Sequence, residues 1–141
     1  MMRFLPAYPL VALALTACGP SASVGTSAAS GSLEDRWEAR VATQTIAERI
    51  ADNCYGEGIY LASSPYGGAV NRVTEQMVAE GEDRAALDAL FMNHDFDRTM
   101  AAVDTWMARA GATPAQPATL CAAARQEIAE GSPVGQALRT M

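Results

Sequence analysis

The clearest periodic stretch of this chain is FDRTMAAVDTWMARA, residues 96–110, and it decides the fold class. Its large apolar residues recur at steps of four, three, four and three, which is the spacing of one face of an α-helix. These residues are Phe96, Met100, Val103, Met107 and Ala110. We therefore expect one helix of an antiparallel bundle that buries this face, with Arg98 and Asp104 nearer solvent.

Helical patterns also flank this stretch on both sides. The predicted ranges are about 33–53, 69–80, 83–92 and 117–130, and a last short helix opens at Ser132-Pro133. Ser32 and Asp35 resemble a capping box at the start of the first helix. No alternating run is long enough to predict a strand. The sequence thus predicts an all-α fold, a small bundle of about five to six helices.

The N-terminal segment predicts where in the cell the protein is located. Arg3 and the apolar run that ends at Leu15 are typical of a signal peptide, because the run is too short to span a bilayer. Leu15-Thr16-Ala17-Cys18 matches the lipobox of bacterial lipoproteins, which implies cleavage after residues 1–17 and lipidation of Cys18. Two or more acyl chains give stable anchoring. The alternative is an ordinary secretory signal in which Cys18 merely falls inside the cleavage region.

Residues 18–32 follow as a tether of Gly, Ser and Ala that cannot bury a core, so we expect the lipidated Cys18 to be joined to a helical domain at 33–141 by disordered chain. Gly19 stands where an Asp would retain a lipoprotein in the inner membrane of enterobacteria. We therefore expect a lipid-anchored protein of the bacterial cell envelope, at the outer membrane and facing the periplasm.

Charge and cysteine content limit which molecules the protein can bind and how its cysteines can pair. The chain has no Lys and a formal net charge of −6, so it repels phosphate backbones, and we exclude nucleic acid as a partner. With Cys18 assigned to lipid, Cys54 and Cys121 remain as an even pair in an oxidising compartment. They form either a disulfide bond or two small buried apolar side chains that never meet.

Few residues are candidates for catalysis, metal binding or ligand binding. His94 is the only histidine, and its neighbours Asp95 and Asp97 are explained by a helix cap rather than by catalysis. We therefore expect no enzyme activity, no metal site and no cofactor. Tyr55, Tyr60 and Tyr66 share one irregular loop; they form either a binding surface or a satellite core under the loop.

Two segments carry a resemblance to a known family. They are Ile50-Ala51-Asp52-Asn53-Cys54 and the C-terminal run from Cys121 to Arg139, CAAARQEIAEGSPVGQALR. With the helix end Trp106–Gly111, they resemble an uncharacterised family of small exported alphaproteobacterial proteins. This resemblance implies an all-α fold and a Cys54–Cys121 disulfide. It transfers no catalytic residue, because the family has no established activity. The lipobox departs from the plain cleavable signal of that family.

Two function classes fit these observations. The first is a membrane-anchored envelope lipoprotein that acts as a non-enzymatic interaction or structural module, with the lipid at Cys18 in the membrane and an envelope protein as possible partner. The alternative is a periplasmic carrier that binds a small ligand in a cavity between helices. A filled core with an exposed apolar patch favours the first class, and an apolar pocket with convergent polar groups favours the second.

Overall fold

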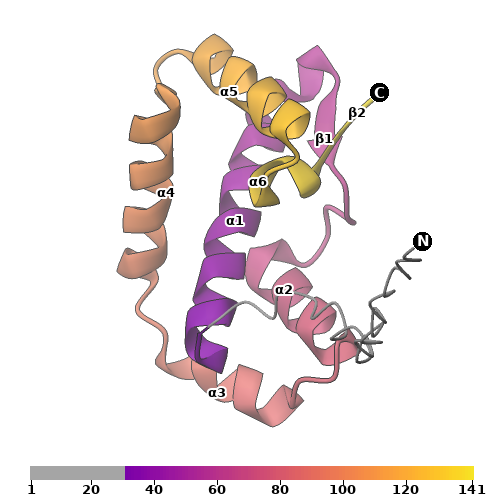
Figure 1. Cartoon of the computed structure of the whole chain (residues 1–141), viewed down its shortest axis with the longest axis vertical. Helices are drawn as coiled ribbons and strands as arrows, with labels where there is room; N and C mark the ends of the chain where they lie inside the picture. The colour runs from indigo at the N-terminus through magenta and orange to yellow at the C-terminus, as the bar shows by residue number, and fades with distance from the viewer. Residues whose placement is uncertain (1–30) are drawn as a thin grey trace, which may run out of the picture.

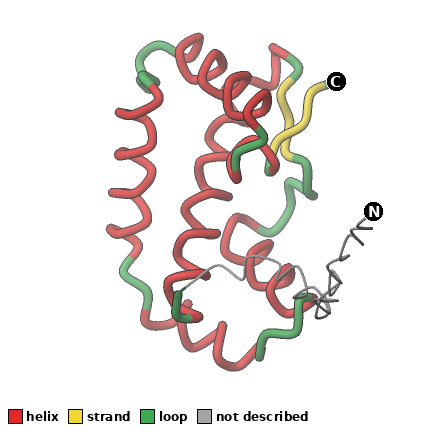
Figure 2. Tube along the Cα trace, in the orientation of Figure 1, coloured by secondary structure: helices red, strands yellow, loops and turns green. Residues whose placement is uncertain are grey.

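A computed structural model describes residues 31–141. The expected signal peptide, Cys18 and nearly all of the expected tether lie outside these described residues. Within 31–141 the chain is mainly helical, as Figures 1 and 2 show. The elements are α1 (Leu33–Cys54), the 3₁₀ turn η1 (Tyr55–Glu57), β1 (Ile59–Leu61), α2 (Gly68–Ala79), α3 (Arg84–Asn93), α4 (Phe96–Ala110), α5 (Pro117–Glu130), α6 (Pro133–Gln136) and β2 (Leu138–Thr140). The all-α prediction is confirmed.

Helix α1 is the axis of the fold. It has 22 residues, about 33 Å at 1.5 Å per residue, and α2, α4, α5, α6 and β1 all pack against it. Figure 1 shows α4 along one side of α1, α2 on the other side, and α5 with α6 across its C-terminal half. Its start is fixed by the predicted capping box, in which Ser32 accepts from the Asp35 N–H and Asp35 accepts from the Ser32 N–H.

A disulfide bond joins Cys54, at the end of α1, to Cys121 in α5, with their Cα atoms 5.6 Å apart. The predicted pairing is therefore confirmed. Both cysteines lie in the larger of two buried apolar clusters, which we call the disulfide cluster. Its members come from the C-terminal half of α1, the strands, the C-terminal half of α4, the α4–α5 turn, α5 and α6, and include Ile46, Ile50, Ile59, Val103, Met107, Leu120 and Leu138.

The second buried cluster, which we call the tryptophan cluster, lies at the other end of α1. It joins the N-terminal half of α1 to α2 and α3. Its fully buried members are Trp37, Val41, Val73, Met77 and Leu87. The two clusters divide the length of α1 between them.

A two-stranded antiparallel sheet is the part of the fold that the sequence did not predict. Strand β1 pairs with β2 in the register Ile59 to Thr140 and Leu61 to Leu138. Figure 2 shows both strands at the end of the molecule that carries the C-terminus. Each strand has three residues, too few for an alternating pattern to stand out from a loop. The sheet brings the last residues of the chain back to the end of α1.

The bounds predicted for α4 are confirmed, but the predicted inward face is wrong at its N-terminal end. Val103 and Met107 are buried, whereas Phe96 and Met100 are 44% and 39% exposed. Thr99 and Trp106 are buried instead. The buried position at this end of the helix therefore moves from Met100 to the adjacent Thr99, while Val103 and Met107 stay buried as predicted. Thr99 can be buried because its hydroxyl lies 2.7 Å from His94 Nε2, so this polar group has a hydrogen-bond partner in the interior.

Helix α6 packs tightly on the end of α5 because residue 135 is glycine. A Cβ at Gly135 would clash with the carbonyl of Glu127. Ser132 caps α6 by accepting from the Gly135 N–H at 3.0 Å, as its cap signal predicted. The Ser132 hydroxyl also donates to Glu127 Oε2, and Trp106 Nε1 donates to Glu127 Oε1 at 3.0 Å. One carboxylate thus ties α4, α5 and α6 together.

Candidate functional site

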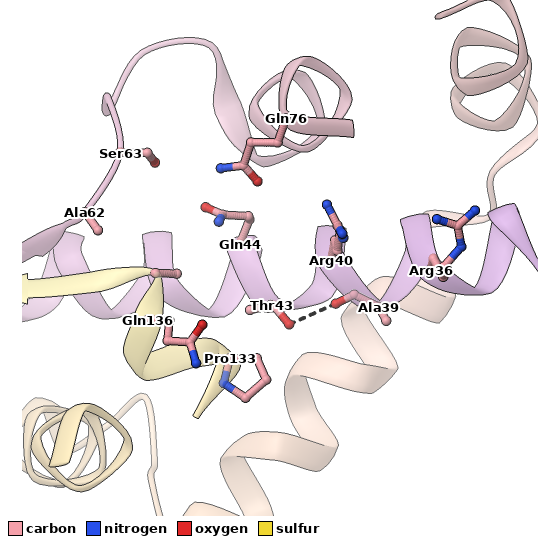
Figure 3. Close-up of a pocket in the computed structure, with 11 residues that line it drawn as sticks. Arg36, Ala39, Arg40, Thr43, Gln44, Ala62, Ser63, Gln76, Pro133 and Gln136 are labelled. Carbon is pink, nitrogen blue, oxygen red and sulfur yellow. Dashed lines mark hydrogen bonds between the residues drawn. The ribbon is translucent and has the colours of Figure 1, made fainter. Parts of the chain in front are cut away.

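An open groove of about 590 Å³ lies over one face of α1. Helix α2 and residues 62–63 form one wall, and the short helix α6 forms the other, as Figure 3 shows. The floor and walls hold small residues, three glutamines and two arginines. The lining residues are Arg36, Ala39, Arg40, Thr43, Gln44, Ala62, Ser63, Gln76, Pro133, Gln136 and Ala137.

The face of α1 beneath the groove follows directly from helical spacing. Arg36, Arg40, Thr43 and Gln44 lie at positions i, i+4, i+7 and i+8, so they form one polar stripe. This stripe adjoins the apolar residues that α1 buries in the two clusters. The apolar residues of helix 33–53 predict only its buried face, so this polar stripe is the sequence signal that could have located the groove.

Gln44 is the most unusual residue of the groove. It is 8% exposed, and its Oε1 is buried without a hydrogen-bond partner. Ser63 Oγ, on the neighbouring wall, is also buried without a partner. Figure 3 shows the Gln44 and Gln76 amides pointing toward one another across the groove. An unsatisfied buried polar atom costs about 1–3 kcal/mol. A ligand that forms hydrogen bonds with Gln44 and Ser63 would therefore recover free energy on binding.

Two arginines lie at one end of the groove, and each is paired with a glutamate. Arg36 Nη1 lies 2.6 Å from Glu82 Oε1, and Arg40 lies 2.8 Å from Glu80 Oε2. The hydrogen bond from Arg40 lowers the pKa of the Glu80 carboxyl, with the positive charges of Arg40 and Arg36 adding to this effect. No carboxylate is among the groove-lining residues. The groove lining therefore carries two guanidinium groups and no acid, and the carboxylates of Glu82 and Glu80, just outside the lining, balance both charges.

A buried arginine holds the wall that carries Ser63. Arg72 on α2 is 6% exposed and lies 3.4 and 3.5 Å from the backbone carbonyls of Ser64 and Pro65. It also pairs with Glu48 on α1. These contacts fix the segment between β1 and α2 against α1. The wall of the groove is therefore held by hydrogen bonds as well as by apolar packing.

The structure brings together two of the three tyrosines predicted as a possible binding surface. The Tyr55 and Tyr60 rings pack edge to face with centroids 4.9 Å apart, and both line a small hollow of about 190 Å³ with Arg139. Tyr66 does not line this hollow and is 84% exposed in the segment before α2. The three rings therefore do not form one surface. Strand β1 holds Tyr60 beside Tyr55, whereas Tyr66 lies farther along the chain, after the strand.

His94 lies inside the protein rather than on an exposed turn. Its side chain is 2% exposed, with Nδ1 3.3 Å from Glu38 Oε1 and Nε2 2.7 Å from Thr99 Oγ1. The ring packs edge to face on Trp37 and Phe96. Arg98 Nη2 lies 2.8 Å from the second Glu38 oxygen. These contacts attach the α3–α4 turn to α1, while Asp95 accepts from the Asp97 N–H, as expected of a helix cap.

The corner between α3 and α4 leaves large apolar side chains in solvent. Phe91, Met92, Phe96 and Met100 are between 39% and 77% exposed, and the two phenylalanine rings lie 6.0 Å apart. Such a patch is of the kind that marks contact surfaces.

The described residues provide no evidence for two other kinds of site. Between residues 31 and 141, no group of three or more His, Cys, Asp or Glu side chains is placed to hold a metal ion. In the same part of the chain, every helix is too short or too polar to be a candidate membrane span.

Comparison with known proteins identifies a family of unknown function. No curated protein and no solved structure matches the chain. A family model does match, and it covers residues 34–139, which is the helical body from the first turn of α1 into β2. The groove, the disulfide and both apolar clusters lie within this range. The chain therefore belongs to DUF5333, a family of unknown function.

Proposed function

We propose that this protein is a lipid-anchored module of the bacterial cell envelope that binds a partner protein in the groove between α1, α2 and α6. The observation that supports the proposal is Gln44, which is nine-tenths buried beside the groove with an unpartnered amide oxygen. A buried amide oxygen without a partner costs folding free energy, which a bound donor group would recover. A partner protein can supply such a donor group.

The form of the groove favours a protein partner over an enclosed small ligand. Its volume of about 590 Å³ falls in the range of ligand pockets, but it is open rather than enclosed. Pockets for small ligands bury most of the ligand surface, which an open groove does not do. The periplasmic carrier remains the second candidate, supported by the volume and by the mostly apolar surface of the groove lining.

The proposed address rests on the sequence. Cys18 in Leu15-Thr16-Ala17-Cys18 is the expected lipidation site, and Gly19 favours the outer membrane, with the body facing the periplasm. We propose a non-enzymatic role because no sequence motif for catalysis is present. Replacing Cys18 with Ser should release the protein from membranes or leave an uncleaved precursor. If the variant fractionates and incorporates labelled palmitate like the parent, the lipoprotein assignment is wrong.

The groove itself can be tested by crosslinking in native membranes. A photoreactive amino acid at Gln76 or Gln136, both exposed on the walls, should capture an envelope protein on illumination. The same amino acid at Asp104, exposed on α4 and outside the groove, is the matched control. Capture at Asp104 equal to that at Gln76, or no capture at either wall, would refute the proposed function.

A further inference from the structure

We infer that the groove binds the C-terminal end of an extended polypeptide, holding its main chain with glutamine amides and its terminal carboxylate with arginines. This inference rests on the proposed function and specifies the chemistry of the partner segment. Three features of the described residues support it: the amide side chains, the small residues between them, and the two arginines at one end of the groove.

The amides match a peptide main chain. Gln44, Gln76 and Gln136 each carry one acceptor oxygen and an NH₂ group with two donors. A polypeptide offers one N–H and one C=O at each residue other than proline, so an extended chain can satisfy the buried oxygen of Gln44 and bond the facing Gln76. Ser63 Oγ, buried on the same wall, can take part as donor or acceptor.

The residues between the amides permit close approach of a backbone. Ala39, Ala62, Ala137 and Pro133 are the apolar members of the lining, and none carries a long side chain. A chain that lies against them must have small side chains on the facing side, because alternate residues of an extended segment point to the same face. This selects segments rich in Gly, Ala and Ser.

The arginines select a carboxylate. A guanidinium has five N–H donors. Arg36 uses only Nη1 for Glu82, whereas Arg40 uses both Nη atoms for Glu80, so each arginine retains further N–H donors. Arg–carboxylate pairs are frequently bidentate and charge-assisted. Arg36 lies eight residues before Gln44 on α1, about 12 Å along the helix. An extended segment of about four residues spans this distance at roughly 3.3 Å per residue. A chain bound at Gln44 therefore places its terminal carboxylate at the arginines.

The test uses detergent-solubilised full-length protein and a pool of fluorescein-labelled tetrapeptides built from Gly, Ala, Ser and Gln. Each peptide is prepared with a free C-terminal carboxylate and as the C-terminal amide. We expect the carboxylate form to bind at least about tenfold more tightly by fluorescence polarisation, since a charge-assisted hydrogen bond is lost in the amide. Equal binding of both forms would overturn the assignment of the carboxylate to the arginines.

Two variants locate the binding without unfolding the protein. Arg40→Gln should weaken the carboxylate form about tenfold and leave the amide form unchanged. Arg84→Gln is its matched control, because Arg84 pairs with Glu75 at 2.9 Å in a comparably exposed ion pair outside the groove. Gln44→Leu should lose binding of both forms while the protein stays folded, since it replaces an unpartnered buried amide by an apolar group. An equal loss in Arg84→Gln would overturn the inference.

The outcomes separate this inference from the proposed function. If no tetrapeptide binds while crosslinking at Gln76 persists in membranes, the ligand class is wrong and the groove remains a partner site. Binding of a chitin disaccharide in place of the peptides would also show that the ligand class is wrong. If peptides with an internal Glu and an amidated end bind as tightly as the free carboxylates, the terminal position of the carboxylate is wrong. If the photoreactive amino acid captures no protein at either Gln76 or Gln136, the proposed function itself is refuted.

Discussion

The two ends of α1 are stabilised in different ways. The disulfide cluster holds seventeen buried residues from six elements and the α4–α5 turn, and it includes a covalent link between α1 and α5. The tryptophan cluster holds five buried residues from α1, α2 and α3. It is surrounded by polar contacts instead: the His94–Glu38–Arg98 group on one side and the Arg36–Glu82 pair on the other.

This difference predicts that α1 belongs to two regions of unequal stability. Apolar burial contributes roughly 25 cal/mol per Å², so the larger cluster supplies most of the folding free energy. Surface and half-buried ion pairs contribute little each. The tryptophan cluster should therefore open first, in the way that proteins open locally below their global free energy of unfolding. Mutations that affect one end alone can test this order.

The largest effect is expected from a charge in the disulfide cluster. Val103→Asp places an unpaired carboxylate among fully buried residues, and we expect a loss of more than about 4 kcal/mol, enough to unfold the domain. Arg98→Gln on the same helix is the control. Its side chain is 57% exposed, so the ion pairs to Glu38 and Glu34 should contribute about 1 kcal/mol or less. Equal melting temperatures for the two variants would contradict the burial of this face.

Removing the disulfide should lower the stability of the whole domain without changing its helices. The bond closes a loop of 67 residues, for which chain entropy gives about 4 kcal/mol of stabilisation. Urea unfolding of a Cys54→Ala, Cys121→Ala double variant measures the loss, with circular dichroism as the check on helix content. A helix content that falls along with the stability would show that the bond shapes the fold rather than restricting the unfolded chain.

A cavity in the tryptophan cluster should loosen only that cluster. Trp37→Ala removes a fully buried ring and should cost about 3 kcal/mol. Native-state hydrogen exchange should show faster exchange in α2 and α3, with protection kept in α5. Trp37→Phe is a matched control: it keeps most of the apolar volume and removes an indole N–H that has no partner. Uniformly faster exchange in Trp37→Ala would mean that the two clusters unfold as one unit.

The smallest effect concerns the cap at the start of α1. Ser32→Ala removes one side of the capping box and should cost about 1 kcal/mol at neutral pH, measured by urea unfolding. Hydrogen bonds from Ser32 lower the pKa of Asp35 below its ordinary 3.8. A carboxylate with a lowered folded pKa adds stability above its unfolded pKa and loses it as pH falls through the folded value. The difference between Ser32→Ala and the parent should therefore shrink only below about pH 4. A constant difference down to pH 2 would contradict this link.

Much of the fold could be predicted because its signals are local. Ser32 with Asp35 and Ser132 with Pro133 mark helix starts, while Gly111 and Gly131 end helices in the left-handed region that glycine adopts without strain. The helix bounds follow from these residues within one or two positions. A local signal needs no knowledge of which element packs against which.

Tertiary choices could not be predicted in this way. Thr99 replaces Met100 on the buried face of α4 because a histidine five residues earlier lies within hydrogen-bond distance of its hydroxyl, and periodicity alone does not record such a partner. Gln44 is polar, which favours an exposed position, yet it is buried in the lining of the groove. Scattered carboxylates are typical of a solvated face, whereas Glu127 joins three helices. The groove depends on all these packing choices.

The position of α1 also determines how the protein would respond to mechanical force. The N-terminal segment joins α1 at the tryptophan cluster, whereas the covalent bond lies at the opposite end of the same helix. Tension from the N-terminal side would act first on the turns that contain Trp37 and Val41, and would peel them from α2 before it reached the cross-link. The cross-link would then stop the extension at Cys54. The domain would unfold in a defined order: the tryptophan cluster would separate first, and the disulfide cluster would stay folded.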